Sequence, residues 1–477
     1  MLNLLLSLLS GTGGDAVALE RALAVVDAGD VCADVAFLAS DELEGRDTPS
    51  QGLRLAARYL RARVERLGFR PSGDQGFFDL YTLERSGYDL GKTGAWLETD
   101  GQERALVLGR DYAFFGGGEH ELAGPVVFVG AASEADLAGL DLAGKWALVL
   151  DASRGRGREA WEERRARQER LVAARALGTL SVIDATGPEA EQRDERLAQM
   201  ASFVTGGSLR TPGADEPARG PEFPGLSLAS GPSRELLRAS PKLGTELGRL
   251  RERRVRSPKE TLELENVAAL WPGSDPVLGR EVLVLSAHYD HVGVSGGEIY
   301  NGADDNGSGT STLLAVADAL AQQGPLRRSV LLLWVSGEEK GLLGSEAWTK
   351  APTLPEGHRA VCNLNIDMVG RNAPDKLLIT PSKDLAEYNG LTRLAERLAP
   401  LEGFPVLGSA DQYWERSDHM NFAVHLKIPV AFLFSDVHED YHRPTDDIEK
   451  IDCDKIRRVA RLVLRLLDGL QEDALGL

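Results

Sequence analysis

The stretch EVLVLSAHYDH, residues 281–291, is an apolar run that ends abruptly in histidine and aspartate. Continuous Val and Leu without polar alternation is typical of a strand buried on both faces of a sheet. Similar runs are SVLLLWVS at 329–336, AVCNLNID at 360–367, KLLIT at 376–380 and PVAFLF at 429–434. Segments of helical periodicity are expected between and after them, near 308–323, 341–350, 383–399 and 447–470. The alternation predicts an α/β fold with a mostly parallel central sheet flanked by helices.

Acids and histidines stand where these strands end. In open α/β sheets, ligands bind beyond the carboxyl ends of the strands. The first strand runs into His288, the second into Glu338 and Glu339, and the third into Asp367. Two further polar stretches are NGADDNGSG at 301–309, which opens a helix, and HEDYH at 438–442. We therefore expect an acid- and imidazole-rich cluster at one edge of the sheet.

Buried carboxylates repel one another, and a bound cation is the usual remedy. Two histidines and three carboxylates carry about −3, two Zn²⁺ carry about +4, and a bridging hydroxide balances the remainder. Histidine and carboxylate ligands without thiolate fit catalytic zinc better than structural zinc. The adjacent glutamates 338 and 339 suggest that one binds metal while its neighbour acts as general base. The pattern predicts a dinuclear hydrolase.

Single residues in this set also have ordinary explanations. Asp304 and Asp305 can cap a helix or occupy a turn. His438 and His442 have helical spacing, but Pro444 and the acidic neighbours argue against a helix, so His442 is expected as a ligand and His438 as a bystander. Two more histidines, His291 and His419, are expected in loops or pocket walls, and Tyr289 in packing.

The motifs together resemble the dinuclear-zinc aminopeptidases of metallopeptidase family 28. The resemblance covers residues 264–477 and rests on ENVAALWPGSDP (265–276), AHYDH (287–291), NGADDNGSG (301–309), SGEEKGLLGS (336–345), NLNIDMVGRN (363–372), RSDHMNF (416–422) and EDYHRPTDDIEKID (439–452). LASDELEGRDTPSQG at 38–52 resembles the N-terminal segment of that family. Residues 85–262, with VVFVG, DLAGLDLAGKWALVL and an Ala-rich helix, resemble its inserted, β-rich protease-associated domain.

The resemblance implies a role for each matching position. His288 and Asp367 match ligands of one zinc, Glu339 and His442 ligands of the other, and Asp305 the bridging ligand, followed by a cis peptide bond. Asp290 matches the carboxylate that orients His288. Glu338 matches the general base. The tyrosine that often stabilises the oxyanion is expected at Tyr413 or Trp414, with Asp418 beside the substrate.

The expected function is that of a zinc-dependent exopeptidase that carries two Zn²⁺ ions and removes N-terminal residues from peptides. Glu338 or Asp367 would hold the free amine of the substrate. A carboxypeptidase or dipeptidase on the same scaffold would instead need a basic residue, for which Arg371 and Arg416 are candidates. Glutaminyl cyclisation would use a single zinc. A binding ectodomain without catalysis is expected to have lost ligands, and none of the five is missing.

Composition sets the frame for this hypothesis. The 477 residues are 43% hydrophobic and 27% charged, which suits a globular chain of two or more domains. A net charge of −19 argues against nucleic acid as a partner. The expected divisions are a possible signal peptide at 1–18, an N-terminal helical part of the peptidase at 19–84, the inserted domain at 85–262 and the catalytic domain at 263–477. Within the inserted domain, residues 205–260 are interpreted as loops, and the oligomeric state is left open.

The chain begins with the apolar run MLNLLLSLLS, which is too short to span a bilayer but fits the core of a signal peptide. Ala16-Val17-Ala18 resembles a cleavage site, so export to the periplasm or medium is expected, with no membrane span elsewhere. Three cysteines, Cys32, Cys362 and Cys453, are too few and too scattered for a disulfide framework or a thiolate zinc site.

Overall fold

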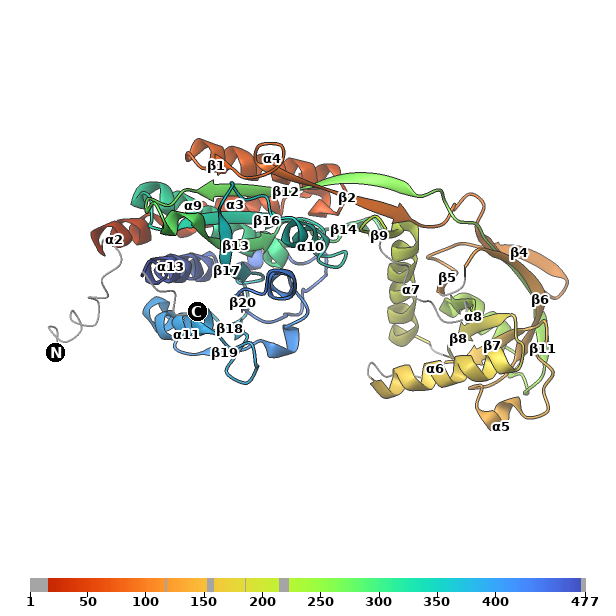
Figure 1. The fold of residues 1–477 in the computed structure, drawn as a ribbon. Coiled ribbons are helices and arrows are strands. Elements are labelled where there is room, and N and C mark those ends of the chain that lie inside the picture. Colours follow the sequence, from red (N-terminus) through yellow and green to blue (C-terminus); the bar gives the residue numbers. More distant parts are fainter. Residues whose placement is uncertain (1–15, 116–117, 152–157, 185, 214–222, 473–477) are drawn as a thin grey trace. The chain divides into compact units, whose positions relative to one another are not determined.

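A computed structural model describes residues 16–115, 118–151, 158–184, 186–213 and 223–472 (Figure 1). The chain forms two compact units. The first combines the residues up to Thr82 with Glu263–Leu477, and the second is Leu83–Leu262. The chain passes from one unit to the other within β2 (Phe78–Ser86) and returns within β12 (Glu260–Trp271).

The first unit is built on a mixed sheet whose centre is parallel. Its strand order is β19-β18-β20-β17-β13-β16-β12-β2, and β1 pairs with β12. The bounds are Arg70–Pro71 for β1, Glu281–His288 for β13, Ser329–Val335 for β16, Arg359–Ile366 for β17, Leu377–Thr380 for β18, Leu407–Ser409 for β19 and Val430–Phe434 for β20. β13 lies parallel to both β16 and β17, and β17 lies parallel to β20. The predicted α/β fold is confirmed.

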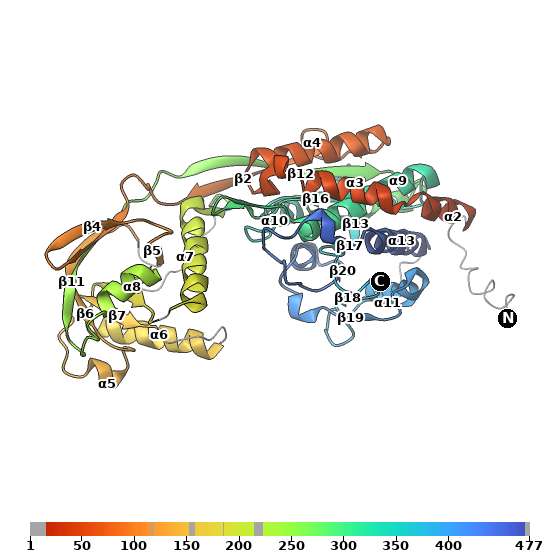
Figure 2. The ribbon, with the colours of Figure 1, turned by 180° about the vertical axis from the view of Figure 1, so that it is seen from behind.

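Helices cover both faces of this sheet (Figures 1 and 2). Alternate strand residues such as Leu283 and Leu332 join one core cluster, while Val284 and Leu331 join another. The first cluster is covered by α2 (Ala16–Val25), α3 (Ala28–Leu38), α4 (Gln51–Arg66), α9 (Gly309–Gln323), α11 (Gly390–Leu398) and α13 (Cys453–Gly469). The second contains Trp348 of α10 (Leu343–Lys350) and Phe422 of η6 (Phe422–Leu426). Burial on both faces explains why the strands read as continuous apolar runs.

A disulfide joins Cys32 on α3 to Cys453 on α13, with the two Cα atoms 5.5 Å apart. The sequence interpretation, which saw three cysteines as too few and too scattered for a disulfide framework or a thiolate zinc site, did not predict this single bond. The packing of α3 against α13 brings together two residues that are 421 positions apart in the chain. Cys362 is a free, buried thiol on β17.

The second unit holds an eight-stranded sheet in the order β4-β3-β11-β6-β7-β8-β10-β5. Its strands are β3 (Gly94–Thr99), β4 (Gln102–Leu106), β5 (Tyr112–Phe115), β6 (His120–Phe128), β7 (Trp146–Leu150), β8 (Gly178–Val182), β10 (Gly225–Leu228) and β11 (Glu246–Arg254). β3 and β4 pair as an antiparallel hairpin around Asp100-Gly101. The helices are α5 (Glu134–Leu137), α6 (Arg158–Ala173), α7 (Pro188–Gly206) and α8 (Ser230–Leu237).

Residues 205–260 are not the loops that the sequence suggested. They contain β9 (Ser208–Arg210), which pairs with β2, as well as β10, α8 and β11. β11 is central, pairing with both β3 and β6. The relationship of this unit to protease-associated domains stays a prediction.

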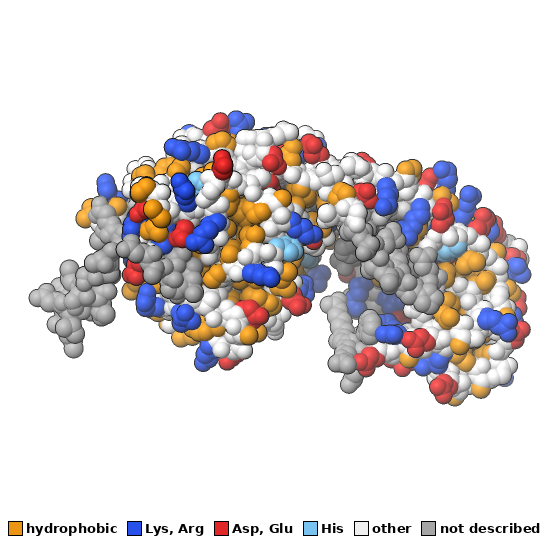
Figure 3. All heavy atoms as spheres, in the orientation of Figure 1, with side chains coloured by type: hydrophobic (Ala, Val, Ile, Leu, Met, Phe, Trp, Pro, Cys, Tyr) orange, Lys and Arg blue, Asp and Glu red, His pale blue; other side chains and the backbone are white. Residues whose placement is uncertain are grey.

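The apolar run at residues 1–10 lies outside the described residues, and α2 begins at Ala16, inside the expected cleavage site. None of the described helices combines the length and the apolar character needed to cross a membrane. On the face drawn in Figure 3, acidic and basic side chains are interspersed over both units. The net charge is therefore not gathered into one patch of that face.

Candidate metal centre

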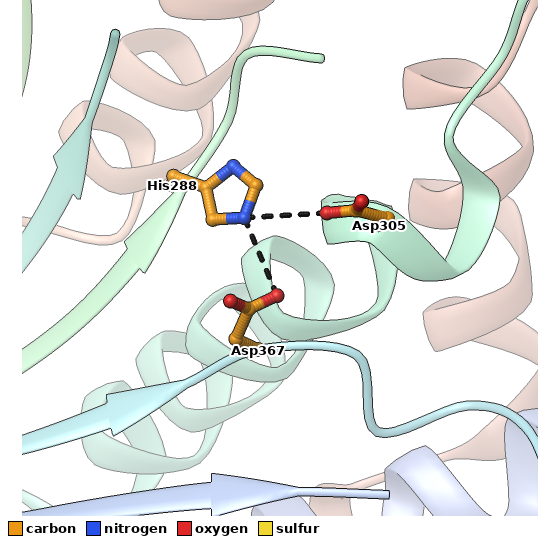
Figure 4. Close-up of side chains that lie close together, drawn as sticks. All are labelled: His288, Asp305 and Asp367. Atoms are coloured by element: carbon orange, nitrogen blue, oxygen red, sulfur yellow. Dashed lines mark hydrogen bonds and ion pairs between the residues drawn. The ribbon is translucent and has the colours of Figure 1, made fainter. Parts of the chain in front are cut away.

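The parallel strands of the first unit deliver polar side chains to one sheet edge. His288 is the last residue of β13, Asp367 directly follows β17, and Glu338 and Glu339 lie shortly after β16. Asp305 comes from the short η3 segment (Ala303–Ser308) that precedes α9. Figure 4 shows His288, Asp305 and Asp367 converging from these three elements.

His288, Asp305 and Asp367 form a first donor cluster. The Nε2 atom of His288 lies 3.4 Å from Asp305 Oδ1 and 3.3 Å from Asp367 Oδ1. Two donors on one tetrahedral zinc are about 3.3 Å apart, given bond lengths of about 2.0–2.1 Å. The other ring nitrogen, Nδ1, lies 3.2 Å from the carbonyl oxygen of Asp290 and 3.7 Å from its Oδ1. These atoms fit a cation on the Nε2 side, with Asp290 orienting the ring.

A second cluster shares Asp305. The Nε2 atom of His442 lies 3.1 Å from Asp305 Oδ2 and 3.1 Å from Glu339 Oε2. His291, expected only in a loop or pocket wall, also belongs here: its Nδ1 lies 2.9 Å from Glu339 Oε1 and 3.7 Å from Asp305 Oδ2. The two oxygens of Asp305 thus face two clusters, as a bridging ligand requires.

Within the described part of the chain, several buried atoms of the second cluster have no hydrogen-bond partner. They are both ring nitrogens of His291, Nε2 of His442 and Oε1 of Glu339. Unpaired buried polar atoms are costly and need an explanation. Donor atoms of nitrogen and carboxylate type aimed at a shared point fit a metal ion such as zinc.

The pKa values of the acids and histidines in the two clusters also indicate that negative charge is in excess there. Burial raises the pKa of Glu338 well above its ordinary value, and the neighbouring Glu339 and Asp418 raise it further. Burial also acts on Asp305 and Glu339, but contacts with histidines outweigh it, so the pKa of Asp305 falls well below its ordinary value and that of Glu339 to about 2. The pKa of His442 rises to about 11 against burial, because Asp305 and Glu339 favour its charged form.

The backbone around Asp305 is held from several directions. Asp446 accepts hydrogen bonds from the backbone N–H groups of Asp304 and Asp305, with the latter at 3.1 Å. The side chain of Asn306 donates to the carbonyl oxygen of Ile366. The expected cis peptide bond after Asp305 is present. The Nε2 atom of His438, which was interpreted as a bystander, lies 3.2 Å from Oδ2 of Asp304.

Three aromatic residues lie near the candidate metal centre or were expected there. Tyr413 donates its hydroxyl to Asp436 Oδ1 at 2.9 Å, and the Trp414 ring packs against His419. Tyr441, which the sequence interpretation did not select, stacks on His442 with ring centroids 3.9 Å apart. Burial raises the pKa of its phenol, and Asp305 and Glu339 raise it further. Its position next to His442 in the chain was the available signal.

The remaining sequence candidates have defined surroundings. Asp418 is fully buried beside the cluster, and burial raises its pKa to about 7. Its neighbour Ser417 donates to Asp367 Oδ2 at 2.9 Å. Of the two arginines proposed for a carboxylate substrate, Arg371 donates to Asp440 at 2.7 Å, and Arg416 is exposed.

Comparison with known proteins gives this donor set a context. Residues 266–467 match the family described as peptidase family M28. A probable leucine aminopeptidase of Arthroderma otae is 28% identical over 228 residues, which are 46% of this chain and 61% of that protein. Aminopeptidase YwaD of Bacillus subtilis is 29% identical over 188 residues, covering 38% of this chain and 40% of the relative. The match to this family is confined to residues 266–467, and the chain spans about three fifths of the first relative's length.

Solved structures agree with the fold. The aminopeptidase from Aneurinibacillus sp. strain AM-1 superposes with a TM-score of 0.61 over 96% of this chain and 97% of that one, at 19% identity. A zinc aminopeptidase from Bacillus subtilis gives a TM-score of 0.58 at 18% identity, over 94% of this chain and 96% of that one. At such identity the likeness concerns the fold.

Proposed function

We propose that the protein is a zinc-dependent aminopeptidase that binds two metal ions. The observation that carries the proposal is the pair of donor clusters sharing Asp305, one with His288 and Asp367, the other with Glu339 and His442. The family of residues 266–467 and the relatives named as aminopeptidases support it. His291 stands within reach of the second ion as a further donor.

When bound, two zinc ions would polarise the scissile carbonyl and acidify a water molecule. Glu338 would accept the proton of that water and pass it to the departing amine. Burial raises the pKa of Glu338 well above that of an ordinary glutamate, in the direction that makes its carboxylate a stronger base. Its backbone N–H donates to Asp290 Oδ1 at 3.2 Å, which fixes the residue beside the orienter of His288.

The oxyanion that forms on the substrate needs a donor beside the metals. Tyr441 is the favoured donor, because its ring stacks on His442 of the centre, whereas the hydroxyl of Tyr413 is bound to Asp436. The excess of carboxylates would attract the protonated amine of a peptide N-terminus, with Glu338 and Asp367 as the nearest candidates. This preference for a free amine separates an aminopeptidase from a carboxypeptidase.

The test combines metal content with a substrate panel. Purified protein should contain about two zinc ions per chain and release nitroaniline from aminoacyl-nitroanilides, but not from their N-acetylated forms. Glu338→Gln should lower the rate of release about 10²- to 10⁴-fold, while the matched control Glu439→Gln, at an exposed glutamate, should leave it unchanged. Equal cleavage of free and acetylated substrates would refute the aminopeptidase assignment. Activity confined to substrates with a free carboxylate would favour a carboxypeptidase.

We also propose that the protein is exported. Disulfides form and persist mainly in oxidising compartments outside the cytoplasm. The Cys32–Cys453 disulfide therefore supports export. The apolar run at residues 1–10 supports the same destination. The test is the N-terminal sequence of the protein recovered from the medium or periplasm of its host. An unprocessed chain found only in the cytoplasm would contradict export.

A further inference from the structure

The segment Arg46–Thr48 runs from the last residue of η1 (Asp41–Arg46) toward α4, far outside the 266–467 match to the peptidase family. Arg46 is 1% exposed, although arginine is rarely buried. Such burial of a permanent charge is tolerated only where the guanidinium is hydrogen-bonded and its charge is balanced.

The guanidinium of Arg46 joins two loops that carry metal donors. Its Nε donates to the carbonyl oxygen of Tyr289 at 2.9 Å, directly after His288. Nη1 donates to Asn301 at 2.7 Å and Nη2 to Gly302 at 3.0 Å, just before the η3 segment. Nη1 also donates to Leu38, within the N-terminal part of the chain. One side chain therefore fixes the His288 loop relative to the loop that leads to Asp305.

The backbone of Arg46 adds a third connection, because its carbonyl oxygen accepts a hydrogen bond from the N–H of His291 at 3.2 Å. The carboxylates of Asp290, Asp305 and Glu339 lie near enough to favour the charged guanidinium. Its positive charge offsets part of the acid excess without occupying a donor position. Arginine suits this place because its donors form a rigid planar fork.

Thr48 connects a third loop. Its hydroxyl donates to Asp290 Oδ2 at 2.9 Å and accepts from the backbone N–H of Gly337 at 3.1 Å. The other carboxylate oxygen of Asp290 accepts from the N–H of Glu338 at 3.2 Å. Asp290 in turn lies beside Nδ1 of His288. Thr48 thereby links the orienter of one ligand to the loop that carries Glu338 and Glu339.

We infer that Arg46 and Thr48 are positioning residues that hold the three ligand-bearing loops in their metal-binding arrangement. The inference rests on the metal centre of the proposed function. It makes the N-terminal segment part of the centre, so that the family-matching segment alone would lack part of the support of its metal site. Residues behind metal ligands typically change metal affinity about 10- to 100-fold when they are altered.

The test is the zinc affinity of Thr48→Val and Thr48→Ser in the full chain, measured by competition with a chromogenic chelator. Thr48→Val should weaken the binding of the zinc held by His288 about 10- to 100-fold, because it releases the orienter of that ligand. Thr48→Ser, which keeps the hydroxyl, should stay within about threefold of the unaltered protein. The control is Thr349→Val, because Thr349 is a buried threonine of α10 whose hydroxyl donates to Ser345. It should lower thermal stability without changing zinc affinity.

A spectroscopic readout separates positioning from stability. The visible absorption of the cobalt-substituted protein should change in Thr48→Val and in Arg46→Lys, and it should be unchanged in Thr349→Val. Zinc affinity of Thr48→Val within twofold of the unaltered protein, with an unchanged cobalt spectrum, would overturn the inference while leaving the proposed function intact. Failure of the unaltered chain to bind zinc or cobalt would overturn both.

Discussion

Each unit of the protein buries a cluster of charged side chains, and the two clusters are built differently. In the second unit, Arg254 donates to Glu252 at 2.7 Å and to the carbonyl oxygen of Gly225, and His120 lies 3.1 Å from the other oxygen of Glu252. Arg254 also covers the ring of Phe114. In the first unit, the acids of the candidate metal centre exceed the cations, and several of its donor atoms have no hydrogen-bond partner among the described residues.

The contrast separates a structural ion pair from a site. A buried charge whose hydrogen bonds are complete needs nothing more from outside the protein. A cluster with an excess of one charge and unpaired donors is incomplete without a ligand. Changes to the Glu252–Arg254 pair of the second unit should therefore alter folding, and changes to the metal centre of the first unit should alter chemistry and metal binding.

The largest expected effect is on catalysis, from Glu338→Gln. We expect kcat to fall about 10²- to 10⁴-fold, because the amide cannot take the proton of the attacking water. Zinc content should stay at the level of the unaltered protein, since Glu338 is proposed as base and not as ligand. Steady-state kinetics with metal analysis checks this. Loss of zinc together with activity would show that Glu338 is a ligand.

The next effect is on stability, from Glu252→Gln in the second unit. It removes the carboxylate that balances a fully buried guanidinium, and breaking such a pair costs about 3–5 kcal/mol. The free energy of unfolding, from denaturant titration, should fall by that amount with zinc affinity unchanged. The matched control is Glu103→Gln on β4, where the glutamate is exposed and 3.6 Å from Arg251, and it should change stability by less than about 1 kcal/mol. Altered zinc affinity in Glu252→Gln would break the contrast.

Zinc should act on the first unit alone. At a free concentration of about 100 times Kd, a single site adds about 2.7 kcal/mol to the free energy of unfolding. Calorimetry with and without zinc, followed by chelation, measures the shift. A rise in the unfolding temperature of the first unit, with that of the second unchanged, is expected. Equal stabilisation of both units would mean that zinc binds elsewhere as well.

The smallest expected effect concerns Asp79 and is a change in how stability depends on pH. Asp79 is a buried acid on β2 whose carboxylate accepts from the amide of Asn266, and burial raises its pKa from 3.8 to about 6. Because the folded-state pKa is the higher one, the protonated form favours folding, and stability falls as the pH rises from about 4 to 6.

The asparagine of Asp79→Asn cannot ionise. The free energy of unfolding of this variant should therefore be about 1–3 kcal/mol higher than that of the unaltered protein at pH 7.5, and nearly the same at pH 4. Denaturant unfolding at the two pH values measures this. The control is Asp375→Asn, at an exposed acid, which should not alter the pH dependence. A destabilised Asp79→Asn at pH 7.5 would show that the charge itself is needed there.

The sequence predicted those parts of the fold that a short run of neighbouring residues determines. The runs that became β13, β16 and β17 are apolar throughout because both sheet faces are covered, so they were recognised. β11 was missed because its inward positions include Glu252 and Arg254. Charged residues at these positions made the sequence resemble a solvated loop, although both are buried. Apolar periodicity cannot detect a strand that buries a satisfied ion pair.

The site followed the same rule. Acids placed directly after strands were expected at one edge, and the structure brings His288, Asp305 and Asp367 together there. The place of His291 depends on how its loop folds back toward Glu339, which no short motif encodes. The disulfide escaped for the related reason that it depends on the packing of two helices from opposite ends of the chain.

The Cys32–Cys453 bond has a consequence for what a protease can release from the molecule. The bond closes a covalent ring over a separation of 421 residues, and this ring contains the whole second unit and all the candidate metal ligands. A single backbone cut anywhere inside the ring leaves the two pieces attached. Nicked protein should therefore keep one full-size band on a denaturing gel without reductant and separate into two fragments when reductant is added.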